Sequence, residues 1–363
     1  MTIRSVQAIP VSVPFEMWGP KPMLGGKPRG MEMLLIRVEN DQGLVGWGEA
    51  FGFVVWPATK TAIEALVEPL VVGRDERDFA AIHADLSKKF HLLGRTGPVM
   101  YALSGLDIAL WDLAGKMQNR SIAEMLGGVR RTQIKAYASL IRYTDPDLVA
   151  LNAQRAVAQG FDAIKLHEIG TVQIERARQA VGPDVRLMVD CNCPWSLDET
   201  LSMCRDLHHL NLHWLEEPIW PPEDHEALAQ VRREGRIPTA AGENASSYLD
   251  FKHMFQAGAI DYAQPSVTKI GGFTEMVRIE QLIEEFKLGF APHSPYVGPG
   301  LLATMHILAA SRSEAELEYC FCEMDDNPMG DCVKADGAYL TLPSGPGLGC
   351  DPDLRLVSTY TVR

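Results

Sequence analysis

From about Ile134 onward, short apolar segments alternate regularly with longer helical stretches such as Asp198 to His209 and Gly272 to Lys287. Eight apolar segments recur at a spacing of roughly 25 residues, which is the spacing expected for a (β/α)₈-type barrel. A doubly wound open sheet is the alternative, and eight units favour a closed barrel. The predicted strands are IKAYASL, DAIKLHE, RLMVDCN, HWLEEP, IPTAAGE, IDYAQPS, LGFAPH and AELEYC.

The first part of the chain has a different order of elements. Three strands with alternating polarity precede helical stretches from Thr59 to about Gly127, which favours an α+β domain. Residues 16–30 are rich in Gly and Pro, and form either a flexible connection or a lid over an active site. From about Met324 the tail holds a Pro/Gly-rich segment and a predicted last strand, LRLVSTYTV, which we expect to return to the first domain. The predicted division is an α+β domain over 1–127, a barrel over 128–323 and a returning segment over 324–363.

Composition and charge narrow the classes of partner. The net charge of −13 argues against nucleic acid and against an anionic membrane. A small anionic substrate remains compatible, because a buried cation and one lysine can set the local field. The most apolar helical stretch is interrupted by Asp107 and Asp112, so it is not expected to span a membrane. The N-terminal segment is interpreted as a strand and not as a signal peptide. Seven cysteines without a CxxC pair favour free thiols and a cytoplasmic location, with zinc binding a remote alternative.

Three carboxylates stand at the ends of three successive predicted strands. They are Asp190 in LMVDCN, Glu216 in WLEEP and Glu243 in AAGEN, 26 and 27 residues apart. Each interval holds about one strand and one helix, so a barrel brings the three acids to one point. Carboxylates in contact repel one another, and a hard divalent cation reconciles them. The sequence therefore predicts a Mg²⁺ site.

The neighbouring strand ends also carry polar side chains, where a purely structural barrel would have turn residues. Taken alone, Lys165 is more often a solvated lysine, and His293 could be a loop histidine or a helix cap. Glu217 is expected to face away from Glu216 and to make a structural contact. Ionisable groups on consecutive strands nevertheless form a strong signal for a site. The polar residues at the remaining strand ends are Lys165, His167, Ser266, His293 and Glu318.

A Mg²⁺ ion flanked by bases is suited to chemistry next to a carboxylate. Chelation of a substrate carboxylate makes its α-hydrogen removable, and Lys165 would stabilise the resulting enediolate. A base poised near neutral pH is then needed, and histidine suits this task. His167 and His293 would lie on opposite sides of the metal. This arrangement permits either removal and return of a proton, or removal of a proton followed by loss of a hydroxyl.

With these motifs in order, the chain resembles the enolase superfamily, in its mandelate racemase and muconate lactonizing enzyme group, over essentially its whole length. The motifs are GWGEA, the run from Ala102 to Gly127, MVDCN, LEEP, GEN and KIGG. The resemblance implies an α/β fold, a modified TIM barrel (β/α)₇β with an N-terminal α+β capping domain. A Lys or His base with Mg²⁺ is this superfamily's known mechanism.

The resemblance also implies roles for individual residues. Asp190, Glu216 and Glu243 match the metal ligands. Lys165 and His167 match the two positions of a K-x-K motif, with His in place of the second lysine; His293 matches the strand 7 histidine. Glu318 matches an acid that hydrogen-bonds the substrate carboxylate in racemase-like members.

One position departs from the group's pattern. Racemase-like members have an aspartate partner for the histidine where this chain has Ser266, and the muconate lactonizing branch has a lysine base there. Serine can orient His293 but cannot stabilise its cation, so we expect His293 to be a weaker base that serves mainly as an acid or as a neutral hydrogen-bonding group. Asn192 and Tyr143 are expected substrate contacts. Specificity is expected in the segments Trp18 to Lys27 and Phe51 to Trp56.

These features predict a Mg²⁺-dependent sugar-acid dehydratase that forms a 2-keto-3-deoxy acid. The alternatives are a racemase or epimerase, a cycloisomerase of a sugar-acid lactone, and a paralogue that has lost turnover. Members of the group often form dimers or octamers, so a homo-oligomer is expected.

Overall fold

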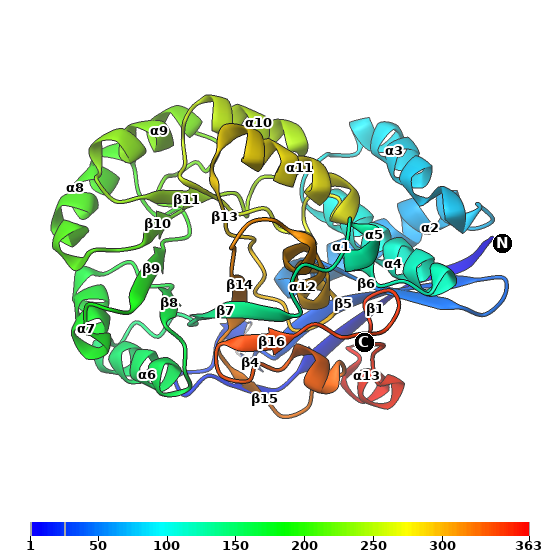
Figure 1. The fold of residues 1–363 in the computed structure, drawn as a ribbon, viewed down its shortest axis with the longest axis horizontal. Coiled ribbons are helices and arrows are strands. Elements are labelled where there is room, and N and C mark those ends of the chain that lie inside the picture. Colours follow the sequence, from blue (N-terminus) through cyan, green and yellow to red (C-terminus); the bar gives the residue numbers. More distant parts are fainter. Residues whose placement is uncertain (1, 25–26, 363) are drawn as a thin grey trace.

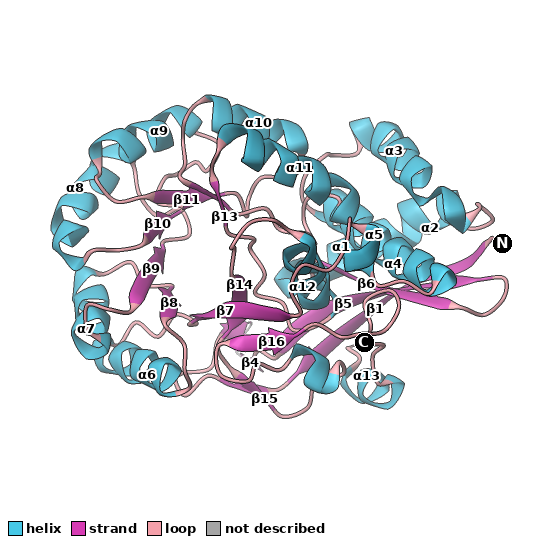
Figure 2. Ribbon diagram, in the orientation of Figure 1, coloured by secondary structure: helices cyan, strands magenta, loops and turns pink. Residues whose placement is uncertain are grey.

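The computed structural model describes residues 2–24 and 27–362 and divides into a barrel and a smaller N-terminal unit (Figure 1). Eight parallel strands follow the order β13-β12-β11-β10-β9-β8-β7-β14, and they form a ring inside a layer of helices (Figure 2). This confirms the modified TIM barrel that the alternation of elements predicts. The barrel strands are β7 (Gln133–Ser139), β8 (Ala163–Leu166), β9 (Arg186–Asp190), β10 (Trp214–Glu216), β11 (Thr239–Ala241), β12 (Tyr262–Ala263), β13 (Gly289–Phe290) and β14 (Leu317–Cys320).

The barrel helices pack on the outside of this ring (Figure 2). Most are amphipathic, and α8 begins with a capping box in which Ser196 and Glu199 satisfy each other's backbone N–H groups. The helix α12 differs because it is apolar on all sides and buried from Pro299 to Ala309. It contacts the barrel strands on one side and the N-terminal unit on the other, which explains why it has no polar face. The barrel helices are α6 (Pro146–Ala158), α7 (Thr171–Val181), α8 (Leu197–Leu207), α9 (His225–Glu234), α10 (Tyr248–Gln256), α11 (Gly272–Phe286) and α12 (Pro299–Ala310).

The N-terminal unit is an antiparallel sheet of order β1-β5-β6 covered by helices, as the sequence predicts. Its longest helix, α4, lies directly on β6, and two strand glycines permit this approach. A Cβ at Gly46 or Gly48 would lie 2.2 Å from a backbone oxygen of α4. The elements are β1 (Ile3–Val13), β5 (Met31–Asn40), β6 (Val45–Ala50), α1 (Trp56–Ala62), a π-helical turn (Ile63–Val67), α2 (Glu68–Val71), α3 (Phe79–Lys89), α4 (Pro98–Gln118) and α5 (Ile122–Met125).

Buried polar contacts fix the N-terminal unit against the barrel. Asp107 of α4 accepts hydrogen bonds from the backbone N–H and the hydroxyl of Thr274, at the start of α11. Glu49 of β6 accepts a hydrogen bond of 2.8 Å from the backbone N–H of Gly300, in the first turn of α12. Burial raises the pKa of Glu49 to about 8, although this hydrogen bond opposes the shift. These contacts hold the N-terminal unit over the carboxyl ends of the barrel strands.

The Gly/Pro-rich segment after β1 is anchored to the barrel. It contains β2 (Phe15–Glu16) and a short hairpin of β3 (Met23–Leu24) and β4 (Lys27–Pro28); residues 25–26 of the predicted specificity segment lie outside the described residues. The ring centroids of Trp18 and Phe321 lie 5.3 Å apart, and the guanidinium of Arg155 lies over the ring of Trp18.

The C-terminal tail contacts both units, and one prediction for it was wrong. LRLVSTYTV is not a strand: it holds α13 (Leu354–Tyr360), because Asp353 accepts hydrogen bonds from the backbone N–H groups of Arg355 and Leu356 and caps a helix. Val357 of this helix packs with β1 and β5 of the N-terminal unit. Earlier in the tail, β15 (Glu323–Met324) pairs with β2, and β16 (Tyr339–Thr341) pairs with the barrel strand β7.

Two further expectations concern the whole chain. All seven cysteines are free thiols. Among the described helices, none is both long and apolar enough to cross a membrane.

Candidate active site

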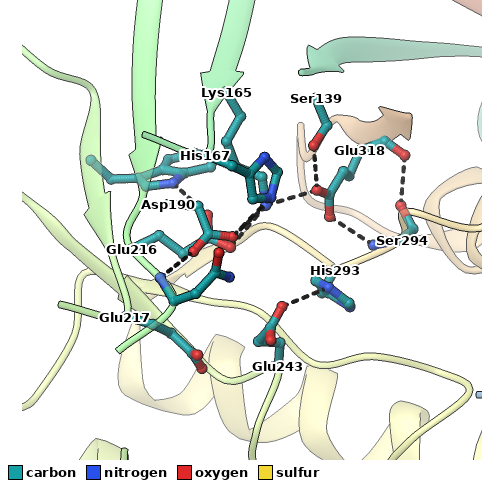
Figure 3. A network of polar contacts seen from close by, with 12 residues as sticks. Ser139, Lys165, His167, Asp190, Glu216, Glu217, Glu243, His293, Ser294 and Glu318 are labelled. Carbon is teal, nitrogen blue, oxygen red and sulfur yellow. Dashed lines mark hydrogen bonds and ion pairs between the residues drawn. The ribbon is translucent and has the colours of Figure 1, made fainter. Parts of the chain in front are cut away.

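The three predicted metal ligands meet at the carboxyl end of the barrel (Figure 3). Asp190 and Glu216 are the last residues of β9 and β10 and are paired in register, whereas Glu243 follows the end of β11. One oxygen from each of the three carboxylates lies within 4.8 Å of the other two. The spacing of the acids along the chain is therefore matched by their convergence in space.

The donor set fits a hard divalent cation. Oδ2 of Asp190 is buried and makes no hydrogen bond among the described residues, although Lys165 and His167 lie within ion-pair distance of it. Burial and the charge of Asp190 raise the pKa of Glu216 well above its ordinary value. The neighbouring carboxylates repel one another enough to drive one of them toward protonation. A bound Mg²⁺ ion, which prefers oxygen ligands, would relieve this repulsion.

Lys165 lies beneath the carboxylates, fully buried. Its Nζ is 2.8 Å from Oε1 of Glu216, 2.7 Å from Oε1 of Glu318 and 3.5 Å from Oδ2 of Asp190. Burial lowers the pKa of Lys165, but the surrounding carboxylates outweigh this and raise the pKa well above its ordinary value. The surrounding carboxylates therefore favour the ammonium form of Lys165 inside the barrel.

His167 flanks the triad at the Asp190 end (Figure 3). Its Nδ1 lies 2.6 Å from the carbonyl oxygen of Leu140, which can only accept a hydrogen bond, so Nδ1 carries a proton. Its Nε2 lies 3.2 Å from Oδ2 of Asp190. Burial lowers the pKa of His167, but Asp190 outweighs burial and the net pKa is raised. The backbone carbonyl thus directs Nε2 toward the reaction site.

His293 flanks the triad at the opposite end (Figure 3). Its Nε2 is 2.7 Å from Oε2 of Glu243. Burial raises the pKa of Glu243, but Lys269 and His293 outweigh burial and leave this pKa well below its ordinary value. The predicted partner, Ser266, makes its described side-chain hydrogen bond with the hydroxyl of Tyr296 and not with His293. The Tyr296 hydroxyl then lies 3.5 Å from Nδ1 of His293. Tyr296 was not among the predicted site residues, although it lies only three residues after the predicted His293.

Glu318 on β14 forms the wall beside Lys165. Its Oε1 accepts a hydrogen bond of 2.8 Å from the hydroxyl of Ser139, and its Oε2 one of 3.0 Å from the backbone N–H of Ser294. Burial raises the pKa of Glu318, but Lys165 and, after it, His293 and His167 lower it overall. Both oxygens therefore already have donors, and an ionised Glu318 holds the ammonium of Lys165 in place.

The remaining predicted residues lie around this centre. Exposed Asn192 accepts a hydrogen bond of 3.1 Å from Arg142, a cation at the rim that sequence reasoning missed. The hydroxyl of buried Tyr143 donates to the carbonyl oxygen of Met17 at 2.8 Å, so Tyr143 has its partner in the Gly/Pro-rich segment after β1. Glu217 is buried beside the site, where burial and Glu243 raise its pKa to about 8.

Two sequence profiles match the chain. The mandelate racemase/muconate lactonizing enzyme N-terminal domain matches residues 8–127, and the enolase C-terminal domain-like profile matches residues 148–356.

Similar proteins cover nearly the same length. The chain is 32% identical to D-galactarolactone cycloisomerase of Agrobacterium fabrum, over 88% of each chain. It is 30% identical to arabinonate dehydratase of Saccharolobus solfataricus, over 92% of this chain and 89% of the relative. It is 31% identical to D-galactonate dehydratase of Ralstonia pickettii, over 89% of this chain and 90% of the relative.

A solved structure shares the whole fold. The 3,6-anhydro-D-galactonate cycloisomerase of Zobellia galactanivorans superimposes with a TM-score of 0.87 at 27% identity, over 100% of both chains. The profiles, the relatives and the geometry of the triad all point to the same family. This chain belongs to the mandelate racemase/muconate lactonizing enzyme group of the enolase superfamily.

Proposed function

We propose that this protein is a Mg²⁺-dependent dehydratase of a sugar acid, which removes the proton α to a carboxylate and then eliminates the β-hydroxyl to give a 2-keto-3-deoxy acid. The observation that carries the proposal is the placement of two histidines at opposite ends of one carboxylate triad, at Asp190 and at Glu243. Two groups on two faces suit a reaction that takes a proton at one carbon and releases oxygen at the next.

The side chains divide the reaction between them. Asp190, Glu216 and Glu243 would hold Mg²⁺, which when bound supplies positive charge that acidifies the α-C–H of a coordinated carboxylate. Nε2 of His167 takes the α-proton, because its Nδ1 is already engaged with a backbone carbonyl.

Two further side chains handle the charge and the oxygen that develop. The ammonium of Lys165, held by Glu318, faces the enediolate oxygens. His293 donates a proton to the departing hydroxyl, and the enol then tautomerises to the ketone.

The substrate class is supported by the relatives and by the rim of the site. Proteins at about 30% identity are named dehydratases of arabinonate, xylonate and galactonate. Arg142 and Asn192 form a polar rim that suits the hydroxyls of a sugar acid. The ammonium of Lys269 lies over the ring of Phe51, which follows β6 of the N-terminal unit.

The test is incubation with Mg²⁺ and D-arabinonate, D-xylonate or D-galactonate in D₂O, followed by proton NMR. Formation of a deoxy-keto acid supports the dehydratase. His167→Asn should abolish both α-proton exchange and product formation. Full turnover by that variant would overturn the assignment of His167 as the base. Exchange of the α-proton without elimination would instead indicate a racemase or epimerase.

A cycloisomerase is the second candidate, because a relative at 32% identity and a structural neighbour both carry that name. The first step is the same, and the leaving group becomes a ring oxygen in place of a hydroxyl. D-galactarolactone and 3,6-anhydro-D-galactonate discriminate the two candidates, since opening of the ring gives an isomer of unchanged mass. A protein that binds Mg²⁺ and an acid without exchange or elimination would be a paralogue that has lost turnover.

Assembly and location complete the proposal. A homo-oligomer such as a dimer or octamer is proposed on the family to which the chain belongs. Seven free cysteines support a reducing cytoplasm. Light scattering of the purified protein tests the assembly.

A further inference from the structure

We propose that Trp214 is a positioning residue of the metal centre, whose indole N–H holds Oε2 of Glu216 and thereby strengthens the binding of Mg²⁺. The inference rests on the Mg²⁺ site of the proposed function and adds to it a residue outside the ligand set. It concerns metal affinity, which can be measured without any substrate.

Trp214 and Glu216 lie on one face of the same strand. Side chains alternate between the two faces of a strand, so the first and third residues of β10 point the same way. Leu215, between them, belongs to the main hydrophobic core, whereas Trp214 belongs to a separate small cluster. Nε1 of the indole lies 2.9 Å from Oε2 of Glu216, and both side chains are buried. Strand geometry alone therefore brings the indole to this metal ligand.

The chemistry of the two groups fixes the direction of this hydrogen bond. An indole N–H only donates and a carboxylate oxygen accepts, so the contact does not depend on the placement of a mobile proton. Nζ of Lys165 lies 2.8 Å from the other oxygen, Oε1 (Figure 3). Both oxygens of Glu216 thus have a donor inside the barrel, and a carboxylate keeps further lone pairs that an ion can use.

An aromatic cluster holds the indole in place. The ring centroid of Trp214 lies 5.2 Å from those of His213 and Tyr262, and 5.8 Å from that of Tyr137, which it meets edge to face at 83°. Packing against three rings locks the rotamer of a side chain that supports a site. Trp214 is 4% exposed, so its N–H would be costly to leave without an acceptor.

The neighbouring phenol provides a contrast within the same cluster. Tyr137 is also buried, but its hydroxyl makes no hydrogen bond among the described residues. Removal of this hydroxyl therefore breaks no described hydrogen bond and leaves the ring beside Trp214. The contrast separates the effect of the indole N–H from the effect of aromatic packing.

The support matters because Glu216 is the middle ligand of the three. Its strand, β10, lies between β9 and β11, which carry or precede the other two acids. A rotation of its carboxylate would alter its distances to both Asp190 and Glu243. Groups that hydrogen-bond a metal ligand orient it, and their loss typically weakens metal binding about 10- to 100-fold.

The first test measures the dissociation constant of Mg²⁺ by isothermal titration calorimetry. Trp214→Phe removes the N–H together with part of the ring. Incorporation of β-(3-benzothienyl)alanine at position 214 exchanges the N–H for sulfur and keeps the bicyclic shape. Both changes should weaken Mg²⁺ binding by about 10- to 100-fold. Tyr137→Phe is the matched control and should bind Mg²⁺ as the wild type does.

Two results of this titration would overturn the inference. One is wild-type affinity in the benzothienyl variant, which decides the question even if Trp214→Phe does not fold. The other is an equal loss in Tyr137→Phe, which would assign the effect to packing of the cluster and not to the N–H.

The second test reads the hydrogen bond itself in the metal-free protein. The difference between the ultraviolet resonance Raman spectra of wild type and Trp214→Phe isolates the indole N–H band of Trp214. We expect a strongly hydrogen-bonded indole. In a Glu216→Gln background the same difference should move toward weaker hydrogen bonding, because the acceptor loses its charge. A band of an indole without an acceptor, or a band unchanged by Glu216→Gln, would contradict the assignment.

The outcomes distinguish this inference from the proposed function. Mg²⁺ binding that does not depend on the N–H contradicts the role of Trp214 and leaves the dehydratase standing. Mg²⁺ binding that does depend on it, in a protein that converts no sugar acid, contradicts the dehydratase and leaves the role of Trp214 standing. A wild type that binds no Mg²⁺ overturns both.

Discussion

Replacement of Lys165 with methionine should destabilise the metal-free protein more than any surface charge change. The ammonium is fully buried between Glu216 at 2.8 Å and Glu318 at 2.7 Å, with Asp190 at 3.5 Å. Methionine keeps most of the volume and removes the charge. The carboxylates then remain in the barrel without their cation, and they must either stay ionised at a high cost or take up protons.

The expected loss follows from the geometry. Removal of one partner from a buried ion pair costs about 3–5 kcal/mol, because the charge left behind is uncompensated. Mg²⁺ binds the same carboxylates, and its charge replaces part of what methionine removes. Mg²⁺ should therefore stabilise Lys165→Met more than it stabilises the wild type, so that the difference in unfolding free energy shrinks when the ion is added.

The assay is urea unfolding of both proteins with a chelator and with saturating Mg²⁺. Lys135→Met is the matched control, because Lys135 also pairs with two carboxylates, Asp162 at 2.6 Å and Glu316 at 3.1 Å, but is 32% exposed. Its loss should be below about 1 kcal/mol and independent of Mg²⁺. If Lys165→Met matches the control in size, or if Mg²⁺ leaves its deficit unchanged, the account of the buried network is wrong.

Three further outcomes follow from other parts of the molecule. Burial lowers the pKa of His306 to about 4 in the folded protein, against about 6.5 in the unfolded chain. As pH falls, the unfolded chain therefore takes up a proton first. Up to roughly 3 kcal/mol of folding stability is lost between pH 6.5 and pH 4. His306→Asn, which can still accept from the backbone N–H of Ala123, should flatten the pH dependence of urea unfolding in that window; an unchanged slope would contradict it. Gly48→Ala should lower stability by about 1–3 kcal/mol, because its Cβ would lie 2.2 Å from the carbonyl oxygen of Gly105, and a neutral result in thermal unfolding would refute this packing argument. Glu243→Gln should abolish the Mg²⁺-dependent rise in melting temperature, and a wild-type rise would show that the ion binds elsewhere.

The centre of the site could be predicted from sequence because barrel geometry converts spacing into proximity. Asp190, Glu216 and Glu243 are separated by one strand and one helix each, and parallel strands end at one edge. Lys165 and His167 follow from the same rule. Their position depends on regular elements, which local patterns specify well.

The parts that sequence reasoning missed depend on loops and caps. Tyr296 lies in the connection between β13 and α12, where no periodicity fixes the direction of a side chain. Arg142 was missed for the same reason, because it lies beyond the end of β7. Val, Thr and Tyr residues in the segment from Leu354 favour a strand, yet the cap at Asp353 outweighs that propensity and a helix forms.

The most direct test of the central claim is the fate of the α-proton of a sugar acid in D₂O. The wild type with Mg²⁺ and D-arabinonate, D-xylonate or D-galactonate should form a 2-keto-3-deoxy acid. A chelator or Glu216→Gln should abolish both this product and the loss of the α-proton signal. Product formed at the wild-type rate after chelation and in Glu216→Gln would contradict a mechanism built on the carboxylate triad.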